Sequence, residues 1–138
     1  MDSDGERPDL ARAPLTVVIV DDSMTLRKTL ATILEASGFD VVGTASSGEQ
    51  AVGLVGVLKP DLVTLDIGLP GMDGIETLGQ IRLISPQTHV VMVTASDDPD
   101  MISRSVELGA ENYITKPYDP DTVIKVLDYI NFQKDRLE

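Results

Sequence analysis

Four apolar runs in this chain end in side chains that could do chemistry together. These side chains are carboxylates, one hydroxyl and one amine: Asp21, Asp22, Asp66, Thr94 and Lys116. A carboxylate buried at the end of an apolar strand is costly unless a cation compensates its charge. We therefore expect Asp66 to have a cation beside it and also to react.

The segments between these residues alternate between strand-like and helical patterns. Apolar runs of strand length are found at 15–20, 39–45, 62–66, 89–94 and 112–115. Apolar residues at helical spacing, or typical start and stop residues, predict helices after Ser23, over 48–58 and 75–84, from Pro99 to Gly109, and from Pro120. Ser47 is expected to cap the second helix, with Gln50 as its capping-box partner.

Five strands alternating with five helices predict an α/β fold in which helices cover both faces of a parallel sheet. The first, third and fourth runs are almost purely apolar, which is typical of central strands. Residues 112–115 alternate as an edge strand does. The pattern favours the flavodoxin-like, doubly wound order 2-1-3-4-5, because a six-stranded nucleotide-binding order would need a sixth strand.

Length and composition limit the classes of protein that remain. We expect one domain over 15–133, a flexible tail over 1–14 and a short tail over 134–138. The net charge of −12 argues against binding to nucleic acid, and the chain has no cysteine for disulfides or thiolate chemistry. It contains neither an apolar run of membrane-spanning length nor a signal-peptide core, so a cytoplasmic protein is expected.

The carboxyl ends of neighbouring parallel strands meet at one edge of a sheet, and sites form where the strand order reverses. Three carboxylates gathered there would repel one another by roughly 4 kcal/mol per pair at 4 Å, for an effective dielectric of about 20. Oxygen ligands and a need for positive charge point to Mg²⁺. A carboxylate beside Mg²⁺, a lysine and a hydroxyl could attack a phosphoryl group and form an aspartyl phosphate.

Taken together, four short motifs resemble those of the receiver domains of two-component response regulators, whose compact form is CheY-like. They are Val-Asp-Asp-Ser at 20–23, Asp-Ile-Gly-Leu-Pro-Gly-Met-Asp-Gly at 66–74, Thr-Ala-Ser at 94–96 and Thr-Lys-Pro at 115–117. The resemblance runs from about Thr16 to Phe132. It implies a signalling module, not an enzyme in its own right, that catalyses only its own phosphorylation and dephosphorylation.

The resemblance also implies roles for individual residues. Asp66 would be the phosphoacceptor, and Mg²⁺ would be bound by Asp21, Asp22, Asp66 and the backbone carbonyl of Gly68. Lys116 would stabilise the phosphoryl group, and the bond from Lys116 to Pro117 would be cis. Thr94 and Tyr113 would be the switch pair, with Thr94 moving inward and Tyr113 rotating from solvent to fill the space.

Two positions depart from the best-known members of that family. Gly68, two residues after the acceptor, has no side chain, and Ser96, two residues after the switch threonine, is small and uncharged. In the family these side chains flank the route of the hydrolytic water. The departures therefore concern the lifetime of the phosphoryl group and leave its acceptance unaffected.

The expected partners are a histidine kinase or histidine phosphotransfer protein, and a downstream protein that binds the surface of the fourth helix, fifth strand and fifth helix. A monomer or weak dimer is expected. A magnesium-dependent phosphohydrolase is the alternative, but such enzymes typically carry a second Asp where Gly68 stands. A nucleotide- or flavin-binding domain would need a glycine-rich phosphate loop after the first strand, where Asp21 and Asp22 stand instead.

Overall fold

The structure is a computed structural model that describes residues 14–137, and side chains as far as Asn131. Apart from Pro14, the tail expected over 1–14 lies outside the described residues. The elements in chain order are β1 (Thr16–Val20), α1 (Met24–Ala36), β2 (Asp40–Ala45), α2 (Gly48–Leu58), β3 (Leu62–Leu65), α3 (Gly74–Ile84), β4 (His89–Thr94), α4 (Pro99–Glu107), β5 (Asn112–Thr115) and α5 (Pro120–Leu137).

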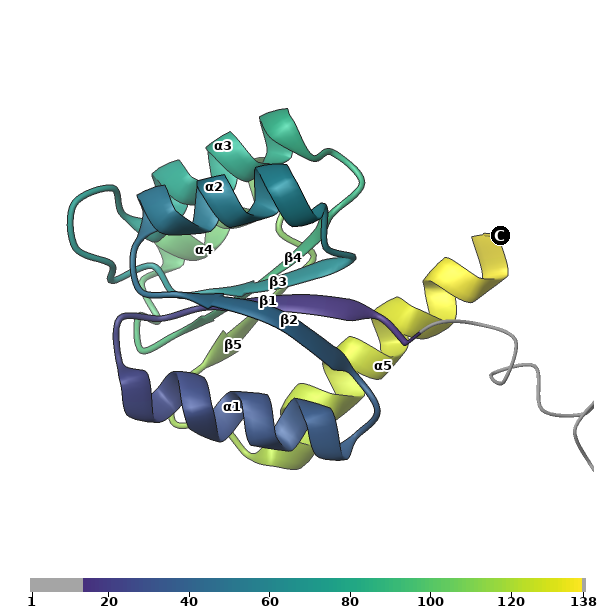
Figure 1. The fold of residues 1–138 in the computed structure, drawn as a ribbon. Coiled ribbons are helices and arrows are strands. Elements are labelled where there is room, and N and C mark those ends of the chain that lie inside the picture. Colours follow the sequence, from purple (N-terminus) through teal and green to yellow (C-terminus); the bar gives the residue numbers. More distant parts are fainter. Residues whose placement is uncertain (1–13, 138) are drawn as a thin grey trace, which may run out of the picture.

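The described strands form one parallel sheet in the order β2-β1-β3-β4-β5, which confirms the predicted flavodoxin-like topology. Helices α2, α3 and α4 cover one face of the sheet, and α1 and α5 cover the other (Figure 1). The sheet therefore has a separate apolar core on each face, and β1, β3 and β4 contribute side chains to both. Burial on both faces explains why these three strands are almost purely apolar.

Helices α1, α2 and α4 begin at the residues that the sequence indicated. The side chains of Ser23, Ser47 and Asp98 each accept a hydrogen bond from a backbone N–H in the first turn of α1, α2 and α4. The capping box of α2 differs in one detail from the expectation. The Gln50 side chain accepts its hydrogen bond from the N–H of Ser46 rather than from that of Ser47.

Several boundaries differ from those expected, most of them by one residue, as at the starts of β1, β2 and α3. Strand β3 ends at Leu65, so Asp66 is the first residue of the loop that follows. Helix α5 continues to Leu137, past residue 133, where we placed the end of the domain. Its inward side chains Val123, Leu127 and Ile130 are buried in the core between the sheet and helices α1 and α5.

The loop after β3 and the start of α3 are held close together by a glycine. A Cβ atom at Gly74 would lie 2.1 Å from the carbonyl oxygen of Asp66, so no other residue fits without movement of the backbone. The N–H of Gly74 also donates to the carbonyl oxygen of Ile67, at 2.8 Å. Helix α3 is thereby tied to the two residues at the carboxyl end of β3.

Candidate functional site

Three carboxylates meet at the carboxyl ends of β1 and β3. Asp21, Asp22 and Asp66 each have an oxygen within 4.8 Å of an oxygen of the other two, and such a group could hold a metal ion. Asp21 and Asp66 are buried, whereas Asp22 is exposed. The pairing of β1 with β3 causes this approach, because the N–H of Asp66 donates to the carbonyl oxygen of Val20.

Lys116 joins two of these carboxylates. Its Nζ donates to Asp21 Oδ2 at 2.5 Å and to Asp66 Oδ2 at 3.0 Å. Burial acts to lower the pKa of Lys116, but the hydrogen bonds to Asp21 and Asp66 and the charges of both carboxylates raise it above its usual value. The lysine is therefore a fixed positive charge at the centre of the site.

Local backbone contacts orient the two buried carboxylates. The N–H of Gly68 donates to Asp66 Oδ1 at 3.2 Å, and the N–H of Ser23 donates to Asp21 Oδ1 at 2.9 Å. In both cases the donor lies two residues after the acceptor. Each carboxylate thus has one oxygen held by the backbone and its other oxygen held by Lys116.

Thr94 and Tyr113 lie on the neighbouring strands β4 and β5. Thr94 is buried at the carboxyl end of β4, and its hydroxyl accepts a long contact of 3.4 Å from the N–H of Ser96. Tyr113 is half-buried against the core under α2, α3 and α4, and its hydroxyl donates to the carbonyl oxygen of Ser96 at 2.8 Å. The tyrosine is therefore already anchored in this conformation, and not free in solvent as the expected switch would begin.

Burial raises the pKa of Tyr113 above its usual value. The hydrogen bond with Ser96 acts in the opposite direction, and the charges of Asp97, Asp98 and Asp66 raise the pKa further. The phenol at this position is therefore kept neutral and remains a hydrogen-bond donor.

The structure adds contacts that the sequence analysis did not find. Arg27 in the first turn of α1 donates from its guanidinium to the carbonyl oxygen of Asp21 at 2.8 Å. The spacing of six residues across a helix start could have indicated this contact. The hydrogen bond from Tyr113 to a backbone carbonyl of the β4–α4 loop could not be predicted from the sequence, because every residue has such a carbonyl.

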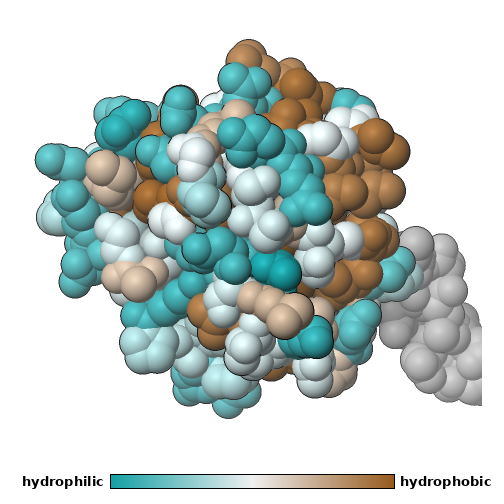
Figure 2. Space-filling model, turned by 60° about the vertical axis from the view of Figure 1, so that its left-hand side comes forward, coloured by the Kyte–Doolittle hydropathy of each residue, from teal (hydrophilic) through white to brown (hydrophobic). Residues whose placement is uncertain are grey.

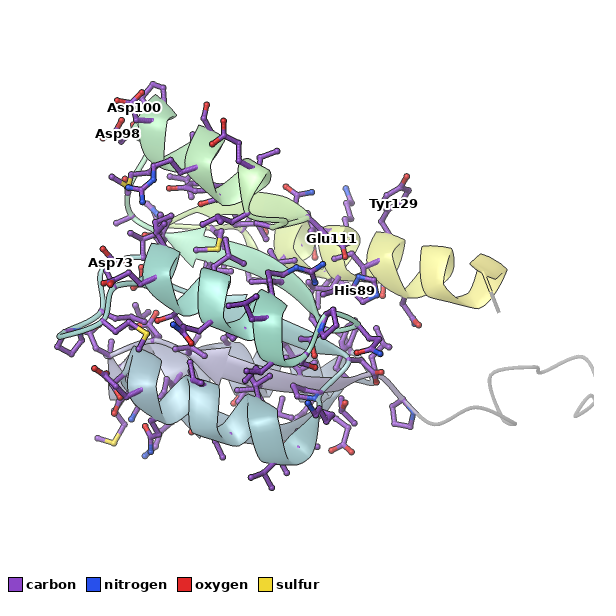
Figure 3. The ribbon with its side chains drawn as sticks, turned by 90° about the horizontal axis from the view of Figure 1, so that it is seen from above. Asp73, His89, Asp98, Asp100, Glu111 and Tyr129 are labelled. Carbon is purple, nitrogen blue, oxygen red and sulfur yellow. The ribbon has the colours of Figure 1, made fainter. Side chains whose placement is uncertain are left out.

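The single histidine has no place in this site. His89 begins β4 and pairs with Glu111 just before β5. Figure 3 shows this pair at the opposite end of the molecule from Asp73 and Asp98, the capping residues of α3 and α4. Since the carboxylate cluster lies at the carboxyl ends of the strands, His89 is separated from it by the length of the sheet.

The fold and the acidic site define a class of protein that comparison with known families identifies. The family model for the response regulator receiver domain matches residues 17–128. The chain belongs to this family.

Two relatives differ in how much of their own length is matched by this chain. The chemotaxis protein CheY of Listeria monocytogenes is 40% identical over 114 residues, which are 83% of this chain and 96% of that protein. The nitrate/nitrite response regulator NarL of Escherichia coli is 35% identical over 83% of this chain but only 53% of its own length.

Solved structures agree with this likeness. The structure of a CheX–CheY–BeF₃–Mg²⁺ complex from Borrelia burgdorferi has a TM-score of 0.85 and 33% identity, and it covers 88% of this chain and 92% of that one. A CheY-like receiver domain from Methanospirillum hungatei has a TM-score of 0.82 and 27% identity, with coverage of 89% and 98%.

Two further observations concern the expectations for the site. The bond from Lys116 to Pro117 is cis, as the family resemblance implied. Within residues 14–137, no helix has both the length and the apolar composition needed to cross a membrane.

Proposed function

We propose that this chain is a phosphoacceptor module in which Asp66 receives a phosphoryl group from a histidine kinase or a histidine phosphotransfer protein. The observation that carries the proposal is the cluster of Asp21, Asp22 and Asp66, in which Lys116 joins Asp21 to Asp66. A carboxylate nucleophile needs positive charge close to the oxygens of the incoming group. Lys116 supplies one such charge, and the oxygen-only donor set suits Mg²⁺.

In the proposed step, a carboxylate oxygen of Asp66 forms a bond to phosphorus. The bond between phosphorus and the donor's imidazole nitrogen breaks, and that nitrogen keeps the electron pair. Lys116 and the N–H of Gly68 each hold one oxygen of Asp66, so the carboxylate is fixed in position at the site where the phosphoryl group would arrive. Buried Thr94 would then offer its hydroxyl to a phosphoryl oxygen.

The residues present fit the metal that the family implies. Asp21, Asp22 and Asp66 would bind Mg²⁺ together with the carbonyl oxygen of Gly68, and the ion would neutralise charge on the transferring oxygens. The geometry supports this assignment, since three carboxylates this close together require more positive charge than Lys116 alone provides. Arg27 contributes indirectly by fixing the backbone of Asp21.

The proposed output is a change in the surface of α4, β5 and α5 that a downstream protein binds. Its carrier would be the Thr94–Tyr113 pair, because Tyr113 already contacts the loop that joins β4 to α4. Movement of Thr94 toward a phosphoryl group would shift that loop and, with it, the start of α4. The cytoplasmic location expected from the sequence stays part of this proposal.

The test is incubation with acetyl phosphate and Mg²⁺, followed by intact mass measurement. Wild-type protein should gain the mass of one phosphoryl group, and Asp66→Asn should gain none. Asp98→Asn, which removes the same charge outside the carboxylate cluster, is the matched control and should be labelled like wild type. A wild-type protein that stays unlabelled, or an Asp66→Asn variant that is labelled equally, would refute the proposal.

A further inference from the structure

A buried hydroxyl directly beneath the candidate site has no assigned role. Thr64 in the middle of β3 is only 1% exposed, and its Oγ1 has no hydrogen-bond partner among the described residues. Most buried polar groups in proteins are hydrogen-bonded, because an unmet donor or acceptor loses its water without replacement. The Thr64 hydroxyl therefore needs an explanation.

Thr64 lines a small internal cavity. The cavity offers about 10 Å³ to the centre of a water molecule, which is enough for one water. Three other residues of the lining carry polar groups, namely Asp21, Lys116 and Tyr118. The remaining wall is apolar and consists of Ile19, Val20, Leu26, Leu30 and Val93.

The pairing of β3 with β1 shows on which face of the sheet the cavity lies relative to Asp66, the proposed phosphoacceptor. Residues two apart on a strand share a face, so the side chain of Thr64 points to the same side of the sheet as that of Asp66. Thr64 is paired with Ile19 on β1, and Ile19 belongs to the core on the α1 and α5 side. The cavity thus lies between the sheet and α1, on the inner side of Asp21 and Lys116.

The ammonium group of Lys116 has one N–H donor that neither Asp21 nor Asp66 accepts. Its ammonium group carries three N–H donors, and two of them go to Asp21 and Asp66. Lys116 and Thr64 both line the cavity, so the donor that Lys116 does not use for Asp21 or Asp66 is available to a molecule bound there. A water molecule needs two to four polar partners to be stable in a protein interior, and this cavity supplies them.

We infer that one structural water molecule binds in this cavity, where it accepts a hydrogen bond from Lys116 Nζ and joins it to Thr64 Oγ1. Thr64 is then a positioning residue for Lys116. The water holds the ammonium group from the side of the core without competing for the carboxylate oxygens that would bind Mg²⁺. No proton or electron is transferred in this arrangement.

The consequence for phosphorylation rests on the proposed function. Lys116 must keep its ammonium group at Asp66 while the phosphoryl group arrives, and loss of a supporting contact would let it move. Removal of an outer partner at metal sites commonly costs 10- to 100-fold in affinity or activity. We expect Thr64→Val, which keeps the shape but removes the hydroxyl, to slow labelling by acetyl phosphate about tenfold.

The first arm of the test is structural and does not require phosphorylation. A high-resolution crystal structure of the wild-type protein should show an ordered water within hydrogen-bond distance of both Thr64 Oγ1 and Lys116 Nζ. In Thr64→Val that water should be absent, and in Thr64→Ser it should be retained. A dry cavity in the wild type, or a water that stays in Thr64→Val, would overturn the inference.

The second arm measures the labelling rate with acetyl phosphate and Mg²⁺ in the same variants. Thr64→Ser should restore most of the rate lost in Thr64→Val. The matched control is Thr88→Val, because Thr88 is also buried but lies at the other end of the sheet, where its hydroxyl contacts Ser85 and Pro60. This variant should be destabilised yet should label at the wild-type rate.

The outcomes separate this inference from the proposed function. A Thr64→Val protein that is more stable than wild type and labels at the same rate would show that the hydroxyl is an idle buried group, and would overturn the positioning role. If the wild-type protein gains no label at all, the proposed function fails, and the crystallographic arm still decides whether the water is bound.

Discussion

Lys116 is the residue on which the electrostatics of the site depend. Its ammonium group donates to two of the three clustered carboxylates, Asp21 and Asp66, and lies between them. The hydrogen bonds raise its pKa, so it stays charged across the physiological range. A positive charge held in this way explains how two carboxylates can be buried at adjacent strand ends.

Gly68 leads to a prediction at this scale, which rests on the proposed phosphorylation of Asp66. A side chain at this position would flank the route of water to the phosphoryl group. The position is exposed, and a Cβ atom there would meet nothing within 4 Å, so a side chain can be added without strain. We expect Gly68→Asn to be phosphorylated as wild type is but to lose the phosphoryl group at a different rate. The measurement is the decay of labelled protein by intact mass, and identical decay in the two proteins would contradict the expectation.

Tyr113 leads to a prediction on pH dependence. Its pKa is raised in the folded protein, so the folded state favours the neutral phenol. The stabilisation is fully present below the ordinary tyrosine pKa of about 10 and is lost as the pH rises through the higher folded value. In an ultraviolet titration, we expect the wild type to show one tyrosine ionising above the ordinary pKa that the Tyr113→Phe variant does not show. If the variant instead lacks a tyrosine that ionises at the ordinary pKa, then Tyr113 is not held buried against the Ser96 carbonyl in solution.

At the scale of elements, the start of α3 is the part to test, because it follows the loop that begins with Asp66, the proposed acceptor. The side chain of Asp73 accepts a hydrogen bond from the N–H of Glu76 at 2.9 Å and caps the helix. Gly74 then packs against the backbone of Asp66. The cap and the close contact together connect the position of α3 to that of the acceptor.

We expect Asp73→Ala to lower the free energy of unfolding by about 1 kcal/mol, as is typical when an N-cap is lost. Urea denaturation followed by circular dichroism measures this change. Asp73→Asn keeps a capping oxygen and is the control, so it should lose much less stability. Equal losses in the two variants would mean that the charge of Asp73 matters rather than its hydrogen bond.

At the scale of the whole molecule, the dominant feature is a negative charge of −12. Figure 2 shows hydrophilic residues over much of the face it presents and hydrophobic residues gathered toward one side. Asp73 and Asp98 cap helices α3 and α4, and Asp100 lies in the first turn of α4, all at one end of the molecule (Figure 3). Their charge adds to the attraction of cations toward the site.

This charge distribution predicts that Mg²⁺ stabilises the folded protein. A ligand that binds only the folded state at 100 times its Kd adds about 2.7 kcal/mol to the free energy of unfolding. Thermal unfolding should therefore shift upward with added Mg²⁺ in the wild type, and the shift should be lost in Asp21→Asn. Asp98→Asn is the control with the same loss of charge, and it should keep the shift. A shift that is equal in both variants would indicate unspecific screening.

Local patterns in the sequence were sufficient for most of the fold. Ser47 was recognised as a cap because the side chain of an N-cap accepts a hydrogen bond from a backbone N–H two or three residues further on. The bounds of β4 and β5 agree with the expected runs, since apolar composition and strand length carry that signal. The strand order also followed from the apolar character of β1, β3 and β4.

What only the tertiary structure decided are the contacts between residues far apart in the chain. The ion pair of Lys116 with Asp21 spans 95 positions, and the hydrogen bond of Tyr113 with the Ser96 carbonyl spans 17. The cavity next to Thr64 is formed by side chains from four separate parts of the chain, and no residue type or spacing indicates it. Sequence patterns report the neighbours within about one turn or one strand, whereas these features depend on how the packed layers meet.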